Sequence, residues 1–98
     1  MVRVVYGKDT ERDIEHYFIK RLTGRGESYK WVSPGVAGVP DRIVFFPGGA
    51  VHLVEFKAPG EAPRKLQQVI FRRLARLGIP VTVLDSRAAV DAFLEVIP

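Results

Sequence analysis

The sequence has no cysteine, which excludes disulfide bonds and zinc sites built on thiolates. It also lacks an apolar run long enough to cross a bilayer, and no stretch resembles a signal peptide. No Walker-type phosphate loop is present, and the two histidines, His16 and His52, form no Ser-His-Asp or Cys-His arrangement. We therefore expect a soluble cytoplasmic protein with no membrane partner and no nucleotide cofactor.

Positive charge is present in excess and is unevenly distributed along the chain. The formal net charge of the 98 residues is +4, and a basic excess of this kind favours an anionic partner, nucleic acid first. The alternative is that arginine-rich helix surfaces only keep the protein soluble. The basic residues gather in two groups, Lys20, Arg21, Arg25 and Lys30, and then Arg64, Lys65, Arg72, Arg73 and Arg76.

Length and apolar spacing predict one α/β domain over residues 1–98, with helices and strands in the order α-β-β-β-α-β-α. The first helix is capped by Asp9 or Thr10 and ends near Leu22, the second covers residues 64–77, and Ser86 caps the third. Strands are expected at residues 28–32, 42–46, 51–56 and 81–84. The strand, helix and strand at the end of this order predict a parallel crossover, hence a small mixed sheet flanked by helices.

Apolar residues at helical spacing give the expected core positions of the three helices. They are Ile14, Phe18, Ile19 and Leu22 in the first helix, Leu66, Val69, Ile70, Leu74 and Leu77 in the second, and Ala89, Val90, Phe93 and Leu94 in the third. Residues 1–6 are apolar except for Arg3 and are expected to form a short strand or a partner-binding arm. A domain this small is only modestly stable alone, which favours self-association.

Three charged residues, Asp41, Glu55 and Lys57, lie on the apolar hairpin of the second and third strands. Buried charges are costly unless they are paired or bind a metal, and two carboxylates suit Mg²⁺ or Mn²⁺. A three-residue loop at residues 47–49 would place Asp41 across from Glu55, whereas a two-residue loop would place it opposite Phe56, on the wrong face. We favour the first register. Lys57 then shares a strand face with Glu55 and could orient or deprotonate a water, or stabilise charge on a phosphate.

Two helices offer supporting side chains for such a site. Glu15 lies beside the apolar stripe of the first helix and could reach a metal directly or through a water, while Glu11, one turn earlier, is the competing candidate. In the second helix, Gln67 lies in the first turn near Lys57, and its neighbour Gln68 is expected to be exposed. The side chains expected to contact nucleic acid, or equally to be ordinary surface residues, are Lys30, Trp31, Arg42, Lys65, Arg72, Arg73 and Arg76.

Two short boxes give the chain a resemblance to a known family. Residues 38–42, Gly-Val-Pro-Asp-Arg, and residues 55–60, Glu-Phe-Lys-Ala-Pro-Gly, followed by Gln67 and Gly78, resemble the VRR-NUC domain (virus-type replication-repair nuclease) of the PD-(D/E)XK superfamily. The resemblance implies a restriction-endonuclease-like core and DNA cleavage that depends on Mg²⁺ or Mn²⁺. Stand-alone members from phages and bacteria act as homodimers on branched DNA such as Holliday junctions, so the expected location is a bacterial cell or a phage-infected host.

The same resemblance assigns roles to individual positions. Asp41 and Glu55 would bind the metal together with the backbone carbonyl of Phe56, and Lys57 would be the catalytic lysine. Glu15 would be the helix glutamate and Gln67 the supporting amide. Two other functions stay open at this point, which are a nucleic-acid-binding module without catalysis and a nuclease subunit that needs a helicase or packaging partner.

Overall fold

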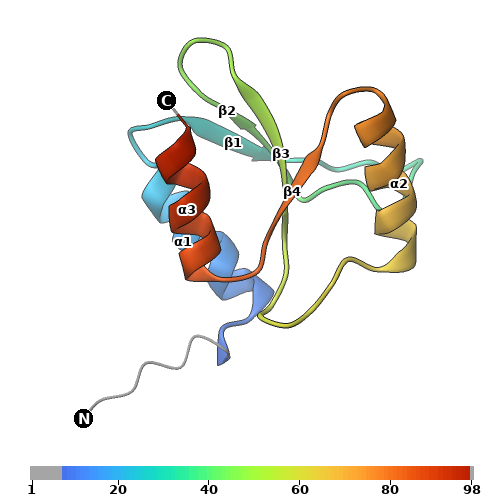
Figure 1. Cartoon of the computed structure of the whole chain (residues 1–98), viewed down its shortest axis with the longest axis horizontal. Coiled ribbons are helices and arrows are strands. Elements are labelled where there is room, and N and C mark those ends of the chain that lie inside the picture. Colours follow the sequence, from blue (N-terminus) through green and yellow to red (C-terminus); the bar gives the residue numbers. More distant parts are fainter. Residues whose placement is uncertain (1–7, 98) are drawn as a thin grey trace.

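In the computed structural model, which describes residues 8–97, the elements follow one another in the predicted order α-β-β-β-α-β-α (Figure 1). Their bounds are α1 Glu11–Leu22, β1 Glu27–Lys30, β2 Arg42–Phe45, β3 Val51–Phe56, α2 Lys65–Arg76, β4 Val81–Leu84 and α3 Arg87–Val96. The strand or arm expected at residues 1–6 lies outside the described residues. Among residues 8–97, no helix combines the length and the apolar character needed to cross a membrane.

The helix caps form as the sequence predicts. Thr10 is the N-cap of α1, where its hydroxyl accepts from the Asp13 N–H at 3.1 Å and the Asp13 carboxylate accepts from the Thr10 N–H at 2.9 Å. This reciprocal pair satisfies two backbone donors that the first turn of a helix leaves open. Ser86 caps α3 through a bond from the Ala89 N–H at 3.0 Å.

The four strands form one mixed sheet in the order β1-β2-β3-β4, antiparallel except for the parallel pair β3 and β4. Arg42 pairs with Val54, so the preceding residue, Asp41, lies across from Glu55. The Phe46 N–H bonds to the Ala50 carbonyl at 2.9 Å and closes the three-residue loop 47–49. The hairpin register predicted from the sequence is therefore confirmed. β1 ends at Lys30, two residues earlier than expected. Beyond it, one last backbone hydrogen bond joins the Trp31 N–H to the Asp41 carbonyl.

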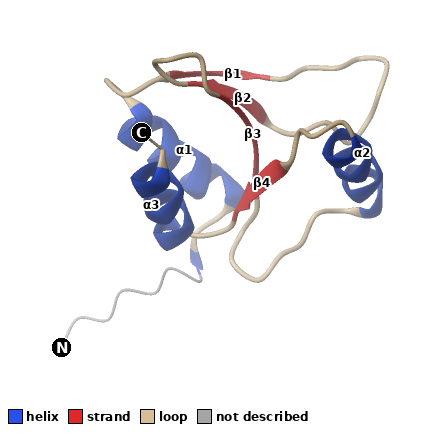
Figure 2. Cartoon of the chain, turned by 45° about the horizontal axis from the view of Figure 1, so that its top comes forward, coloured by secondary structure: helices blue, strands red, loops and turns tan. Residues whose placement is uncertain are grey.

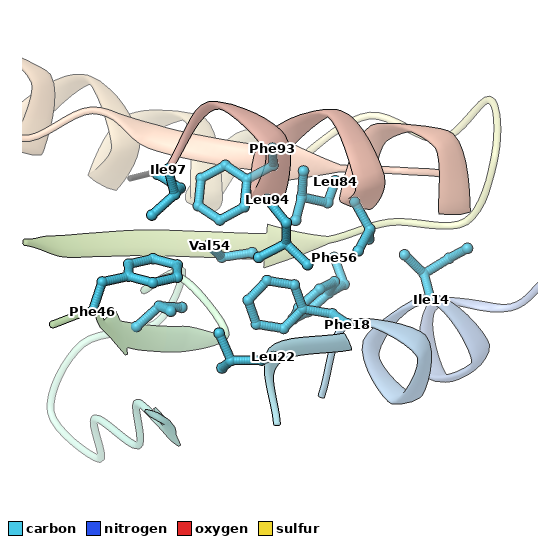
Figure 3. Close-up of a cluster of buried hydrophobic side chains, with 12 residues drawn as sticks. Ile14, Phe18, Leu22, Phe46, Val54, Phe56, Leu84, Phe93, Leu94 and Ile97 are labelled. Carbon is cyan, nitrogen blue, oxygen red and sulfur yellow. The ribbon is translucent and has the colours of Figure 1, made fainter. Parts of the chain in front are cut away.

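The hydrophobic core lies between α1, α3 and one face of the sheet (Figure 3). It contains Ile14, Phe18, Leu22, Val44, Phe46, Val54, Phe56, Leu84, Val90, Phe93, Leu94 and Ile97. His52 belongs to this face, where its ring meets Phe46 and Phe93, and it therefore points away from Glu55 as predicted. The prediction for Ile19 is wrong: its side chain is 37% exposed, because it lies beside a cleft rather than in the core.

Helix α2 lies beyond β4, away from α1 and α3 (Figure 2). Its sole buried residue is Gln67, while Leu66 and Leu77 are 64% and 76% exposed. The prediction that the apolar side chains of this helix form part of the core is therefore wrong. Val69, Ile70 and Leu74 face inward but are only half-buried. The helix meets the rest of the protein mainly through its first turn and through β4.

Candidate active site

A cleft of about 500 Å³ opens where the end of β3 meets α1 and the start of α2. It is lined by Glu11, Arg12, Glu15, His16, Ile19, Lys30, Asp41, Arg42, Glu55, Phe56, Lys57, Arg64 and Gln67. The structure thus brings the five predicted catalytic residues to one place, with two of the predicted nucleic-acid contacts, Lys30 and Arg42. The other predicted contacts do not line it: Trp31 is half-buried just after β1, and four exposed residues lie on α2, namely Lys65, Arg72, Arg73 and Arg76.

Asp41 and Glu55 both line the cleft, because the hairpin register places them directly across from each other. One carboxylate oxygen of Asp41, Oδ2, accepts the backbone N–H of Phe56 at 2.8 Å. Glu55 is only 1% exposed, and its Oε2 accepts from the Gln67 side-chain amide at 2.6 Å. Among the side chains that the structure describes, Glu55 Oε1 is the one buried polar atom that has no hydrogen-bond partner.

The two carboxylates sit in an environment that disfavours their negative charge. Burial is the main cause that raises the pKa of Asp41 above its ordinary value, and the nearby Glu15 and Glu11 raise it further. Burial also raises the pKa of Glu55, and the charge of Asp41 adds to the effect, while Lys57 and Gln67 oppose it. A cation bound between them would relieve both penalties at once.

The donor set fits a hard divalent cation. Mg²⁺ usually binds through one or two carboxylates and keeps several of its waters, and the unpartnered Glu55 Oε1 is an acceptor of the required kind. Within residues 8–97, no group of three or more acidic or histidine side chains converges closely enough to hold an ion alone. Asp41 and Glu55 alone would therefore not complete the coordination of an ion, and water or further oxygen donors would have to supply the rest.

Lys57 is 4% exposed and forms two ion pairs. Its Nζ lies 3.2 Å from Glu55 Oε2 and 3.4 Å from Oε1 of Glu11 on α1. Glu11, which competes with Glu15 as the helix glutamate in the sequence, thus contacts the lysine directly. Its carboxylate is half exposed to the cleft.

Glu15 has a different set of partners. Its Oε2 accepts from Arg42 Nε at 2.7 Å and lies 3.9 Å from Lys30 Nζ. Arg42 is largely buried and also donates to the Ser28 hydroxyl at 3.1 Å. The two glutamates of α1 therefore pair with different basic side chains. Glu11 pairs with Lys57, and Glu15 pairs with Arg42 and Lys30. The sequence does not reveal the Arg42–Glu15 pair, since the two residues are far apart in the chain and opposite charge is the only signal.

Gln67 uses both ends of its amide. Its Nε2 donates to Glu55, and its Oε1 accepts the backbone N–H of Arg64 at 2.9 Å. The neighbouring Gln68 is exposed and donates to the Pro63 carbonyl at 2.8 Å. The choice of Gln67 over Gln68 as the inward amide is confirmed. Arg12, His16 and Arg64 line the cleft but were not expected there, because nothing in their local pattern separates them from surface residues.

Comparison with known proteins adds to this geometry. No family model matches the chain. It is 46% identical over 78 residues to a protein named "Putative nuclease p44" from Acyrthosiphon pisum secondary endosymbiont phage 1, which covers 79% of this chain and 84% of the relative. A solved structure described as a VRR-NUC domain superposes with a TM-score of 0.82 at 27% identity, over 92% of this chain and all of that one.

The chain belongs to the VRR-NUC family of nucleases. The mixed sheet with helices in the order α-β-β-β-α-β-α is that of the VRR-NUC fold, so the fold class expected from the two boxes is confirmed. Both boxes line the cleft: Asp41 and Arg42 come from the first, and Glu55, Phe56 and Lys57 from the second. Membership in the family and the position of the cleft together identify the chain as a nuclease.

Proposed function

We propose that this VRR-NUC protein is a Mg²⁺- or Mn²⁺-dependent DNA endonuclease that cleaves branched DNA, such as Holliday junctions, as a homodimer. It would act in the cytoplasm of a bacterial cell or a phage-infected host. The observation that carries the proposal is the buried Glu55, whose Oε1 has no partner in the described structure, beside Asp41 and Lys57 in an open cleft. A buried carboxylate oxygen without a partner is costly in a protein that does not bind a cation there.

The proposed reaction is hydrolysis of one phosphodiester bond. A water oxygen attacks phosphorus, the bond to one ester oxygen breaks, and that oxygen receives a proton. A divalent cation held by Asp41, Glu55 and the Phe56 carbonyl would supply Lewis-acid stabilisation and a more acidic water. Lys57, as an ammonium paired with Glu55 and Glu11, is a donor and not an acceptor, so it suits holding the water or a phosphate oxygen in place.

Gln67 and Arg42 have supporting roles in this proposal. The Gln67 amide holds Glu55 Oε2 and so turns the free Oε1 to one side. Arg42 holds Glu15 and would reach a phosphate only by leaving Glu15 and Ser28, so Lys30, whose side chain is mostly exposed, is the better candidate for a phosphate contact at the cleft. The exposed basic residues of α2 are further candidates for phosphate contacts. Such contacts read the shape and backbone of DNA rather than its bases.

The activity is tested with labelled four-way junction, flap, single-stranded and linear duplex DNA, each with Mg²⁺, Mn²⁺ or EDTA. We expect cleavage of the four-way junction with either metal and none with EDTA, because the two carboxylates alone cannot stabilise the charge that develops on the phosphate. Products that persist in EDTA would refute the metal-dependent mechanism. Cleavage of linear duplex as fast as of the junction would refute selectivity for branched DNA.

The two other functions that the sequence leaves open appear as distinct results of the same experiment. Tight binding of the junction with no products under any metal would indicate a binding module. Products that form only after a helicase or packaging protein is added would indicate a dependent subunit. Neither is favoured by a specific contact in the structure, whereas two neighbouring carboxylates, Asp41 and Glu55, and a lysine paired with Glu55 support hydrolysis.

The homodimer is supported by an exposed apolar surface on the sheet. The side chains of Tyr29, Phe45 and Val51 share the face of the sheet opposite the core, and all three are exposed. Phe45 is directly paired with Val51, and its ring centroid lies 6.1 Å from that of Tyr29. Exposed apolar patches of this kind often mark protein–protein contacts. A two-fold dimer would also present two active sites to two DNA strands.

Light scattering at micromolar concentration tests the dimer. We expect wild type to have twice the chain mass of 11.0 kDa and Phe45→Glu to have the mass of one chain, because a charge inside an apolar contact is strongly unfavourable. Val96→Glu is the matched control, since Val96 is also an exposed apolar residue but lies at the end of α3; this variant should remain dimeric. A wild-type protein that is monomeric with and without junction DNA would contradict the dimer.

A further inference from the structure

The backbone of Gly38 lies directly against the first turn of α2. The φ angle of Gly38 is +92°, in the left-handed region that favours glycine. A Cβ at this position would lie 2.7 Å from the carbonyl oxygen of Leu66, 2.8 Å from its carbonyl carbon and 3.1 Å from the Gln67 nitrogen. These are backbone atoms, which cannot rotate away as the end of a side chain can. Only glycine permits this approach.

The contact joins the loop that precedes Asp41 to the first turn of α2, which supports Glu55. On one side, Gly38 is followed by Val39, the buried Pro40 and then Asp41, which directly precedes β2. On the other side, the backbone nitrogen in contact belongs to Gln67, whose side chain bonds to Glu55 Oε2. The loop before Asp41 and the helix that supports Glu55 therefore rest on each other next to the cleft.

The position of α2 depends on few other contacts. Gln67 is the one buried residue of this helix, and the apolar side chains on either side of its turn, such as Leu66, are exposed or half-buried. A Cβ that would lie 2.7 Å from the Leu66 oxygen reaches an ordinary contact of 3.4 Å only if the first turn shifts by about 0.7 Å. A shift of that size along the hydrogen bond of 2.6 Å would lengthen it to about 3.3 Å, beyond the favourable limit of about 3.2 Å.

We propose that Gly38 is a positioning residue of the active site. Its close backbone contact fixes the position of the first turn of α2, so that the Gln67 amide binds Glu55 Oε2 and leaves Glu55 Oε1 without a partner. The effect on metal binding rests on the proposed function. The effect on the Gln67–Glu55 hydrogen bond does not, because that bond forms within the chain itself.

The variant Gly38→Ala tests the proposal against Gly24→Ala. Gly24 has φ +82° and nothing within 4 Å of its would-be Cβ, so alanine brings similar backbone strain there but no collision. That strain should lower Tm by roughly 4–8 °C in each variant. Only Gly38→Ala should shift the Gln67 side-chain NH₂ signals in a ¹H–¹⁵N spectrum of the metal-free protein, with those signals identified by their absence in Gln67→Ala.

Metal affinity and a double-mutant cycle supply the second readout. Loss of an outer contact to a ligand typically weakens metal binding 10–100-fold, so we expect Gly38→Ala to raise the Kd for Mn²⁺ by about 10-fold and Gly24→Ala to leave it unchanged. In a Gln67→Ala background, Gly38→Ala should add almost nothing, because the two changes act through one hydrogen bond. Full additivity of the two effects would overturn the proposal.

Unchanged Gln67 signals in folded Gly38→Ala would also overturn it, whether or not the protein cleaves DNA. If wild type neither binds Mn²⁺ nor cleaves, the proposed function fails, and the spectrum still decides the role of Gly38. If Gly38→Ala is unfolded in plain buffer, the spectra of this variant, Gly24→Ala and wild type are recorded in sucrose or TMAO, which favour the compact state, and Gly38→Ala is judged there by the same signals.

Discussion

Replacing Lys57 by methionine is expected to lower the single-turnover rate of junction cleavage by about 10²–10⁴-fold, the range found for well-placed proton-transfer and charge-stabilising groups. Methionine nearly matches the length of the buried lysine stem but removes the three donors that face Glu55 and Glu11. Binding of junction DNA in EDTA should stay close to wild type, because Lys57 is only 4% exposed and offers little to a docked duplex.

The rate is measured with enzyme in excess over labelled junction in Mn²⁺, and binding by fluorescence anisotropy. Lys20→Met is the matched control, because Lys20 is exposed on α1 and lies outside the cleft; its cleavage rate should be unchanged. Full activity of Lys57→Met would remove the lysine from the mechanism, and an equal loss of binding and cleavage would make it a DNA contact instead.

The second large effect is expected for Asp41→Asn, which should lower the cleavage rate but raise the stability of the metal-free protein. Cleavage should fall by at least about 10³-fold, because in the proposed mechanism one of two charged ligands is lost and the cation supplies most of the charge stabilisation. The metal-free protein, in contrast, should become more stable at neutral pH. Asparagine keeps an oxygen for the Phe56 N–H and removes a half-buried negative charge close to that of Glu55.

The pH dependence of this stabilisation follows from the sign of the pKa shift. Burial raises the pKa of Asp41 in the folded protein above its ordinary value of 3.8. The neutral acid is thus favoured by folding; this contribution is complete below pH 3.8 and is lost as pH rises through the raised value. Wild type in EDTA should therefore lose stability relative to Asp41→Asn over this interval, and the two should converge at lower pH.

Thermal unfolding in EDTA at several pH values measures the difference. A stabilisation of about 1 kcal/mol would raise Tm by about 4–8 °C in a domain of this size. Added Mg²⁺ should raise the Tm of wild type much more than that of the variant. Asp85→Asn, which removes a half-buried carboxylate outside the cleft, is the control. A lower Tm for Asp41→Asn at neutral pH would show that its charge stabilises the fold.

The hairpin is the part of the site that the sequence predicts best. Strand side chains alternate strictly, so the length of one loop decides whether Asp41 faces Glu55, and the glycines at 48 and 49 supply the left-handed conformations that a three-residue loop needs. The same local logic places the caps Thr10 and Ser86. Each of these predictions depends on residues that are close in the chain.

The errors arise where position depends on distant segments. The apolar spacing of α2 shows which side of the helix faces inward but not how closely it docks, and Leu66 and Leu77 remain exposed because the helix lies beyond β4. Ile19 is exposed for a related reason, since a cleft opens next to its turn of α1. The pairing of Arg42 with Glu15 joins a strand to a helix and has no periodic signature.

The strand that carries Glu55 has a consequence for the cation binding that we propose. β3 is hydrogen-bonded along both edges, to β2 and to β4, and Asp41 is tied to it by the Phe56 N–H. The two carboxylates are thus ordered when the sheet folds, before any ion arrives. Binding of an ion would then cost little conformational entropy of the polypeptide, and the affinity would depend mainly on the charge of the ion and on the water molecules it must release.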